Sequence, residues 1–115
     1  MTVTHIVSFQ FKEGSSPSLV KELVDRMFAL KDTCLHPKTG KSYIVSASGG
    51  RDNSVQGLQN GLTHVFAVGF KDKEDRNYYA QKDPVHLEFV KWSEDVVTQV
   101  LAIDYVDGDF GDHKL

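Results

Sequence analysis

The sequence has a single cysteine, only three prolines and no excess of positive charge. Cys34 alone forms no internal disulfide and no cysteine cluster for zinc, which excludes a disulfide-stabilised secreted scaffold. Thirteen Lys and Arg against sixteen Asp and Glu give a net charge of −3, which disfavours nucleic-acid binding. The longest largely apolar run, 65–70, is far shorter than the ~20 residues that span a bilayer. Polar residues also interrupt the start of the chain, unlike a signal peptide. These absences predict a cytoplasmic protein that binds neither membranes nor nucleic acid.

Length and composition predict one domain. Of 115 residues, 40% are hydrophobic and 25% are charged, the balance of an ordinary globular protein. Two domains of half this length would each bury too little apolar surface, and one domain of this size still gains from association. We therefore predict a domain over residues 1–106, a polar tail over 107–115, and a homodimer.

The spacing of apolar residues predicts a mixture of strands and helices. Alternation with period two marks a strand, whereas apolar residues three and four positions apart mark a helix. Ser16-Pro17 and Asp83-Pro84 suit helix starts, because proline lacks the amide hydrogen that the first turn leaves unused. The predicted elements are a strand 4–11, a helix 17–34, a turn 36–40, a strand 42–48, a loop 49–61, a strand 63–70, a helix capped by Asp72 and running through Tyr79, a helix from Pro84 with His86, Phe89, Val90, Ser93 and Val97 on one face, and a strand 100–106.

This order predicts an α+β, ferredoxin-like split βαβ fold, with a four-stranded antiparallel sheet and its helices on one face. Strand 63–70 is apolar or small on both faces, which indicates that both sides of the sheet are covered. Ile6, Val65 and Ala67 belong to the face that the helices leave bare. Because a bare apolar sheet is unfavourable for a monomer, we predict a second copy packed sheet against sheet.

Three of the five histidines are candidates for one site. His5 and His64 begin neighbouring strands, and His86 lies in the first turn of a helix. Two outcomes stay open: antiparallel packing brings the three rings together, or each ring packs separately with its nitrogens bonded to a carbonyl or carboxylate. Imidazole titrates near neutral pH, and the positive end of the helix dipole favours a neutral His86 ring. This predicts that His86 is a general base rather than an acid.

Tyr78 and Tyr79 lie shortly before His86 in the chain. A phenol in an apolar cavity can orient a carbonyl oxygen or share a proton with a histidine. Since the two are adjacent, at most one faces the pocket, and the alternative for each is an aromatic anchor for a short helix. Both remain catalytic candidates.

Two other chemistries have less support. A three-histidine metal site would need ligands from three separate elements, and no HxH or HxxxH spacing supports it. Cys34 ends an apolar helix, where a thiol usually packs rather than reacts. We predict no metal and no cofactor.

Several segments together resemble the stress-responsive dimeric α/β-barrel (Dabb) family. They are Thr4–Lys12, Gly61–Phe66 with its Thr-His pair, Tyr79, Asp83–Phe89 with its Pro-x-His helix start, and Asp104-Tyr105. The resemblance implies a homodimer whose sheets face each other as a barrel. It also implies similarity to polyketide cyclases of the olivetolic acid cyclase type, in which His86 would be the base and Tyr79 its partner. This chain has one extra residue between the tyrosine and Pro84, so Tyr78 also fits the second role.

Two hypotheses follow. In the first, the protein is a cofactor-free enzyme that performs an aldol or proton-transfer reaction on a small aromatic or polyketide-like molecule, held between helices and sheet. In the second, it is a non-catalytic stress-response or small-ligand-binding dimer. Free space beside His86 distinguishes them. The predicted substrate-binding residues are His5, His64, Met27, Phe28, Phe66, Phe89 and Val97.

Overall fold

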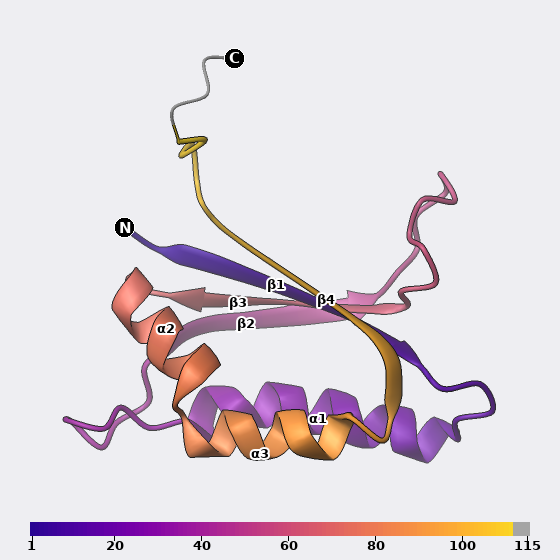
Figure 1. Cartoon of the computed structure of the whole chain (residues 1–115), viewed down its shortest axis with the longest axis horizontal. Helices are drawn as coiled ribbons and strands as arrows, with labels where there is room; N and C mark the ends of the chain where they lie inside the picture. The colour runs from indigo at the N-terminus through magenta and orange to yellow at the C-terminus, as the bar shows by residue number, and fades with distance from the viewer. Residues whose placement is uncertain (112–115) are drawn as a thin grey trace.

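The computed structural model describes residues 1–111 as a four-stranded sheet with helices on one side (Figure 1). The sheet order is β2-β3-β1-β4, and every neighbouring pair is antiparallel. This confirms the α+β ferredoxin-like prediction. The elements are β1 (Val3–Phe11), α1 (Pro17–Thr33), β2 (Ile44–Arg51), β3 (His64–Phe70), α2 (Lys73–Gln81), α3 (Pro84–Ser93) and β4 (Val97–Val106).

The helices begin where the capping residues predict. The Ser16 side chain accepts a hydrogen bond from the Leu19 amide at the start of α1. Asp72 does the same for α2, and Asp83 for α3. Each cap satisfies an amide that has no partner within its helix. No helix within residues 1–111 is long and apolar enough to cross a membrane.

Strand β2 extends further than predicted, because Gly49 and Gly50 belong to the strand and not to the following loop. The strand runs over Ile44–Arg51 rather than 42–48, so it includes Gly49 and Gly50. Gly49 pairs with Phe66 of β3, and a Cβ added at Gly49 would lie 2.5 Å from the Phe66 ring. The glycine therefore permits a close aromatic contact within the sheet instead of ending the strand.

Strand β4 starts earlier than predicted, and this corrects the placement of Val97. Helix α3 ends at Ser93, so Val97 does not continue its apolar face. Val97 instead opens β4 and pairs with Phe11, next to an irregularity in the register between Gln10 and Phe11. Of the predicted tail, residues 112–115 lie outside the described residues.

The core lies between the sheet and the antiparallel pair α1 and α3 (Figure 1). Leu23, Met27 and Leu30 form the buried stripe of α1. Phe9 makes edge contacts with Phe66 and with Phe89 of α3, at centroid distances of 6.0 and 6.4 Å. Helix α2 crosses one end of the sheet, and the start of α3 lies at the same end.

The opposite face of the sheet is apolar and exposed. Ile6 of β1 pairs with Ile103 of β4, and Leu101 and Tyr105 alternate with it on the same face. These three β4 side chains are 44–58% exposed. In Figure 1, α1 and α3 lie below the sheet, whereas the β2–β3 loop and residues 107–111 extend above it. The sheet face that was predicted to have no helices packed on it therefore has none within the described residues.

A buried carboxylate joins α3 to the segment before β2. Asp83 is 1% exposed, and its Oδ1 accepts hydrogen bonds from the amides of Val85 and His86. Its Oδ2 accepts a hydrogen bond from the Tyr43 hydroxyl at 2.5 Å. Val85 and His86 follow Asp83 closely in sequence, whereas Tyr43 is 40 residues away. Asp83 therefore caps α3 and also forms a tertiary hydrogen bond.

We predict that Asp83→Ala destabilises the protein more than loss of an ordinary cap. A lost cap costs about 1 kcal/mol, and a buried Tyr43 hydroxyl without its acceptor adds about 1–3 kcal/mol. Urea denaturation measures the change in the free energy of unfolding. Asp72→Ala is the matched control, because Asp72 caps α2 without a buried tertiary donor. Equal losses in the two variants would contradict the role of the Tyr43 bond.

Candidate active site

His5 is held by a carboxylate on the neighbouring strand. It lies directly opposite Asp104 in the β1–β4 register, and its Nδ1 donates a hydrogen bond to Asp104 Oδ1 at 2.5 Å. Arg76 of α2 donates to the other carboxylate oxygen at 2.9 Å. Because an ionised carboxylate only accepts, the bond places a proton on Nδ1 and leaves Nε2 free in the neutral ring. Asp104 thus sets both the orientation and the tautomer of His5.

His86 is oriented by a backbone carbonyl. Its Nδ1 lies 2.7 Å from the carbonyl oxygen of Tyr79. A carbonyl can only accept, so Nδ1 carries the proton and the neutral ring has its lone pair on Nε2. Burial lowers the pKa of His86 below 6.5, and proximity to His5 lowers it further, against opposing effects of the Tyr79 carbonyl and Asp83. The ring is therefore neutral at pH 7, with one nitrogen able to accept a proton.

Tyr79 connects the two histidines. It is 1% exposed, and its ring stacks on His86 with 3.8 Å between centroids. His5 approaches it edge-on at 5.9 Å, and Phe70 contacts it at 5.0 Å. Burial raises the pKa of the Tyr79 phenol, so the hydroxyl keeps its proton and can act as a donor. We call His5, Tyr79 and His86 the histidine-tyrosine cluster.

Tyr78 faces away from this cluster. Its ring packs against Tyr43 at 5.7 Å and against His36 at 6.4 Å. Of the two candidate tyrosines, the fold thus brings only Tyr79 to His86. Adjacent residues of a helix point in different directions, and the rotation of α2 turns Tyr79 rather than Tyr78 toward His86. The sequence pattern did not predict which of the two would face it.

His64 does not join the cluster, so of the two outcomes that the sequence left open, its ring packs separately. It shares the helix-facing side of β3 with Val68, the partner of His5, but lies four residues away, or about 13 Å along the strand. Its ring contacts Phe11 at 5.0 Å and the Thr63 hydroxyl at 2.8 Å. Burial lowers the pKa of His64 as well. Within residues 1–111, no group of three or more His, Cys, Asp or Glu side chains is arranged to hold a metal.

The residues predicted to line a substrate cavity pack against one another. Met27, Phe66, Phe89 and Val97 are each less than 9% exposed and belong to one core cluster. Phe28 is 39% exposed and contacts Phe66 at 5.4 Å. The four buried side chains therefore belong to the core between the helices and the sheet, and Phe28 packs at its edge.

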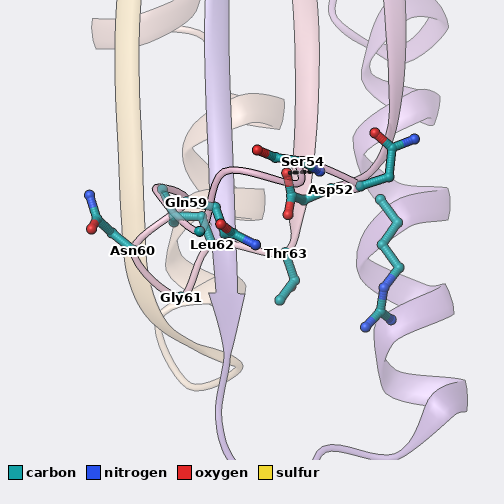
Figure 2. A pocket seen from close by; sticks show the side chains of 10 residues that line it. Asp52, Ser54, Gln59, Asn60, Gly61, Leu62 and Thr63 are labelled. Atoms are coloured by element: carbon teal, nitrogen blue, oxygen red, sulfur yellow. Dashed lines mark hydrogen bonds between the residues drawn. The ribbon is translucent and has the colours of Figure 1, made fainter.

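The hollows described for residues 1–111 lie around this core, and two of them touch predicted lining residues. One of about 180 Å³ touches Phe89 between α1 and α3, and one of about 290 Å³ touches His64. A cavity of about 610 Å³ lies in the β2–β3 loop, where Asp52, Ser54, Gln59 and Asn60 surround it with polar groups (Figure 2). A hollow of about 310 Å³ touches Arg76 and Asp104, on the outer side of the His5 ion pair. Among these hollows, only the one at Arg76 and Asp104 borders the two residues whose hydrogen bonds hold His5.

Asp104 and Arg76 are site residues that the sequence analysis did not predict as such. The period-two alternation of β4 places Asp104 on the same face as Val100 and Ala102, which is an unusual position for a charge. This charge on an otherwise apolar strand face was the sequence signal for Asp104. Its meaning depends on the strand register that sets Asp104 opposite His5.

Cys34, by contrast, is fully buried, and burial together with Asp83 raises its pKa to about 12, so the thiol stays protonated and unreactive.

Comparison with known proteins agrees with this fold. The family model of the stress responsive A/B barrel domain (Dabb) matches residues 3–107. The stress-response A/B barrel domain-containing protein HS1 of Arabidopsis thaliana is 31% identical over 103 residues, which cover 90% of this chain and 87% of HS1.

Two solved structures share the fold at lower identity. The hydroxynitrile lyase of Passiflora edulis has a TM-score of 0.77 and 19% identity, over 96% of this chain and 97% of its own. A dimeric ferredoxin-like protein of unknown function from Bacteroides fragilis has a TM-score of 0.67 and 18% identity, over 90% of this chain and 94% of its own. The domain match over residues 3–107 and the likeness to HS1 confirm the resemblance: the chain belongs to the stress-responsive A/B barrel (Dabb) domain family.

Proposed function

We propose that the protein is a cytoplasmic, homodimeric, cofactor-independent enzyme of the polyketide cyclase type, with His86 as its general base. The observation that carries the proposal is the hydrogen bond from His86 Nδ1 to the Tyr79 carbonyl, which leaves Nε2 unprotonated. The lowered pKa keeps that nitrogen ready to accept a proton at neutral pH.

The proposed reaction needs only groups of this chain. His86 Nε2 removes a proton from a carbon next to a carbonyl, and the electron pair moves to form an enolate. The protonated Tyr79 hydroxyl donates a hydrogen bond to the developing oxyanion. The enolate carbon then attacks a second carbonyl of the same molecule, and the resulting alkoxide takes the proton back from His86 Nε2, which restores the neutral ring. The substrate class is a small aromatic or polyketide-like molecule.

His5 is the proposed positioning partner of this base. Its Nδ1 is engaged by Asp104, so its free Nε2 and edge-on contact with Tyr79 fit a role in orienting substrate. The Passiflora protein of the same fold is named a hydroxynitrile lyase, which supports this architecture as a scaffold for enzymes. His64 is also a predicted substrate-binding residue. Because it lies far from His86, it would contact only the end of a ligand that is remote from the base.

One observation favours a second candidate function, a non-catalytic stress-response or small-ligand-binding protein. Met27, Phe66 and Phe89 fill the space where the substrate would lie, and each is buried in the core. A ligand would enter beside the half-exposed Phe28, through the hollow that touches Phe89, or through the hollow at Arg76 and Asp104. The two functions differ in whether a bound ketone loses a proton.

We expect the protein to exchange the acidic α-hydrogens of an aromatic β-diketone for deuterium in D₂O, as followed by proton NMR. His86→Asn should slow this exchange about 10²–10⁴-fold, the usual contribution of a general base. Tyr79→Phe should also slow it, whereas Tyr78→Phe should not, because Tyr78 faces away from the cluster. Ligand binding in a thermal-shift assay without catalysed exchange would instead support the second candidate.

The lowered pKa of His86 predicts a pH-dependent stability. The unfolded chain binds a proton at this residue near pH 6.5, whereas the folded ring does so only at lower pH. The unfolded state then holds more protons between these values, so the free energy of unfolding should fall as the pH drops below 6.5. The contribution of one group is at most about 1.4 kcal/mol per pH unit.

Urea denaturation over a series of pH values measures this slope. His64 has a lowered pKa too, so the comparison is best made in a His64→Asn background. Adding His86→Asn should flatten the slope. An unchanged slope would show that His86 is not held neutral by the fold.

For the homodimer, we propose that two copies pack through the bare sheet face. Leu101→Lys should dissociate the dimer, because it places a charge within that apolar face, and analytical ultracentrifugation would detect the monomer. Leu87→Lys on α3 is the matched control, since Leu87 is 41% exposed and Leu101 is 44% exposed. Dissociation by the control alone would assign the interface to the helices.

A further inference from the structure

A separate hollow of about 470 Å³ lies at the start of α2, beside the segment that leads into β2. It is lined by residues of the segment 36–45 together with Lys71 and Asp75. None of the histidine-tyrosine cluster takes part in it. The hollow combines a buried acid at Asp75, an aromatic ring at Tyr43 and apolar side chains at Ile44 and Val45, with lysines around them.

The carboxylate of Asp75 lacks a hydrogen-bond donor. Its side chain is 4% exposed, and its Oδ2 is buried without a partner. Lys71 Nζ is 3.8 Å from Oδ2, beyond hydrogen-bond distance, and the lysine side chain is 67% exposed. A buried carboxylate oxygen without a donor is costly, so its presence beside a hollow points to a ligand that supplies one.

The neighbouring His36 does not supply the missing positive charge. The Lys38 amide donates a hydrogen bond to His36 Nδ1 at 3.1 Å. That nitrogen therefore carries no proton, so the ring is neutral and its proton is on Nε2. Nε2 lies 3.6 Å from Asp75 Oδ1. The same tautomer leaves no lone pair on Nε2 for a metal ion, which argues against a cation held jointly by His36 and Asp75.

We propose that this hollow binds the primary ammonium group of a small organic ligand, with Asp75 as its anchor. An ammonium has three donors and a positive charge, which match the unpartnered Oδ2 and the negative charge of Asp75, which the exposed Lys71 approaches only to 3.8 Å. The apolar part of the ligand would lie against Tyr43, Ile44 and Val45. Two sources fit this chemistry, a monoamine and an amino acid, and the carboxylate of an amino acid would also pair with Lys41 or Lys71.

Three ligands with the same branched chain separate these sources. Isoamylamine carries only the ammonium, leucine carries ammonium and carboxylate, and 4-methylpentanoate carries only the carboxylate. Titration of the full chain by ¹H–¹⁵N NMR should show saturable shifts of the Thr39, Ser42 and Val45 amides with the first two ligands. Tighter binding of leucine would identify the amino acid as the preferred source, and tighter binding of isoamylamine the monoamine.

Asp75→Asn should raise the dissociation constant of the binding ligand by about tenfold or more, the usual loss for one charged hydrogen bond. Glu74→Gln is the matched control, because it removes the same charge from an exposed neighbour in the same turn of α2. The dissociation constant of the ligand from the Glu74→Gln variant should stay within about twofold of the value for the unmodified protein. The spectrum of each variant without ligand reports whether it folds.

Three results would overturn the proposal. They are equal binding of 4-methylpentanoate, undiminished affinity in Asp75→Asn, and the absence of saturable shifts at the three amides in the unmodified protein. If Asp75→Asn does not fold, the comparison of the three ligands with the unmodified protein still decides. These readouts do not involve His86, so the proposal stands or fails separately from the proposed enzyme activity.

Discussion

The buried carboxylate of Asp83 determines where the second half of the chain returns to the sheet. One oxygen caps α3 through the amides of Val85 and His86, and the other binds the Tyr43 hydroxyl from the segment before β2. Because α3 begins at this carboxylate, it also sets where the His86 ring meets the Tyr79 carbonyl. Stability and the geometry of the candidate base thus depend on the same buried group.

Hydrogen-bond partners, rather than the histidines themselves, decide what each ring can do. His5 and His86 both donate from Nδ1, to a carboxylate and to a carbonyl, so each turns Nε2 away from that bond, and the lowered pKa of His86 keeps its Nε2 unprotonated. His36 accepts at Nδ1 and presents a proton instead. The first arrangement suits a base and the second does not. The proposed catalytic function rests on this difference, and the packed core around Phe66 and Phe89 is what stands against it.

Most of the fold was predictable because its signals are local. Proline and capping side chains at Ser16, Asp72 and Asp83 act within one turn, and the strands show period two over a few residues. The errors occurred where a distant residue decides. Gly49 belongs to a strand because the Phe66 ring needs its space, and Val97 opens β4 because it pairs with Phe11.

The sequence by itself determined the α+β class, the helix starts and the bare apolar sheet face, since each depends on spacing along the chain or on a helix terminus. Only the tertiary structure decided that Tyr79 rather than Tyr78 meets His86, that His64 stays apart, and that Asp104 holds His5. The physical reason is that strand register and helix rotation bring together residues far apart in sequence. A shift of one residue exchanges the two faces of a strand and turns a helical side chain by about 100°.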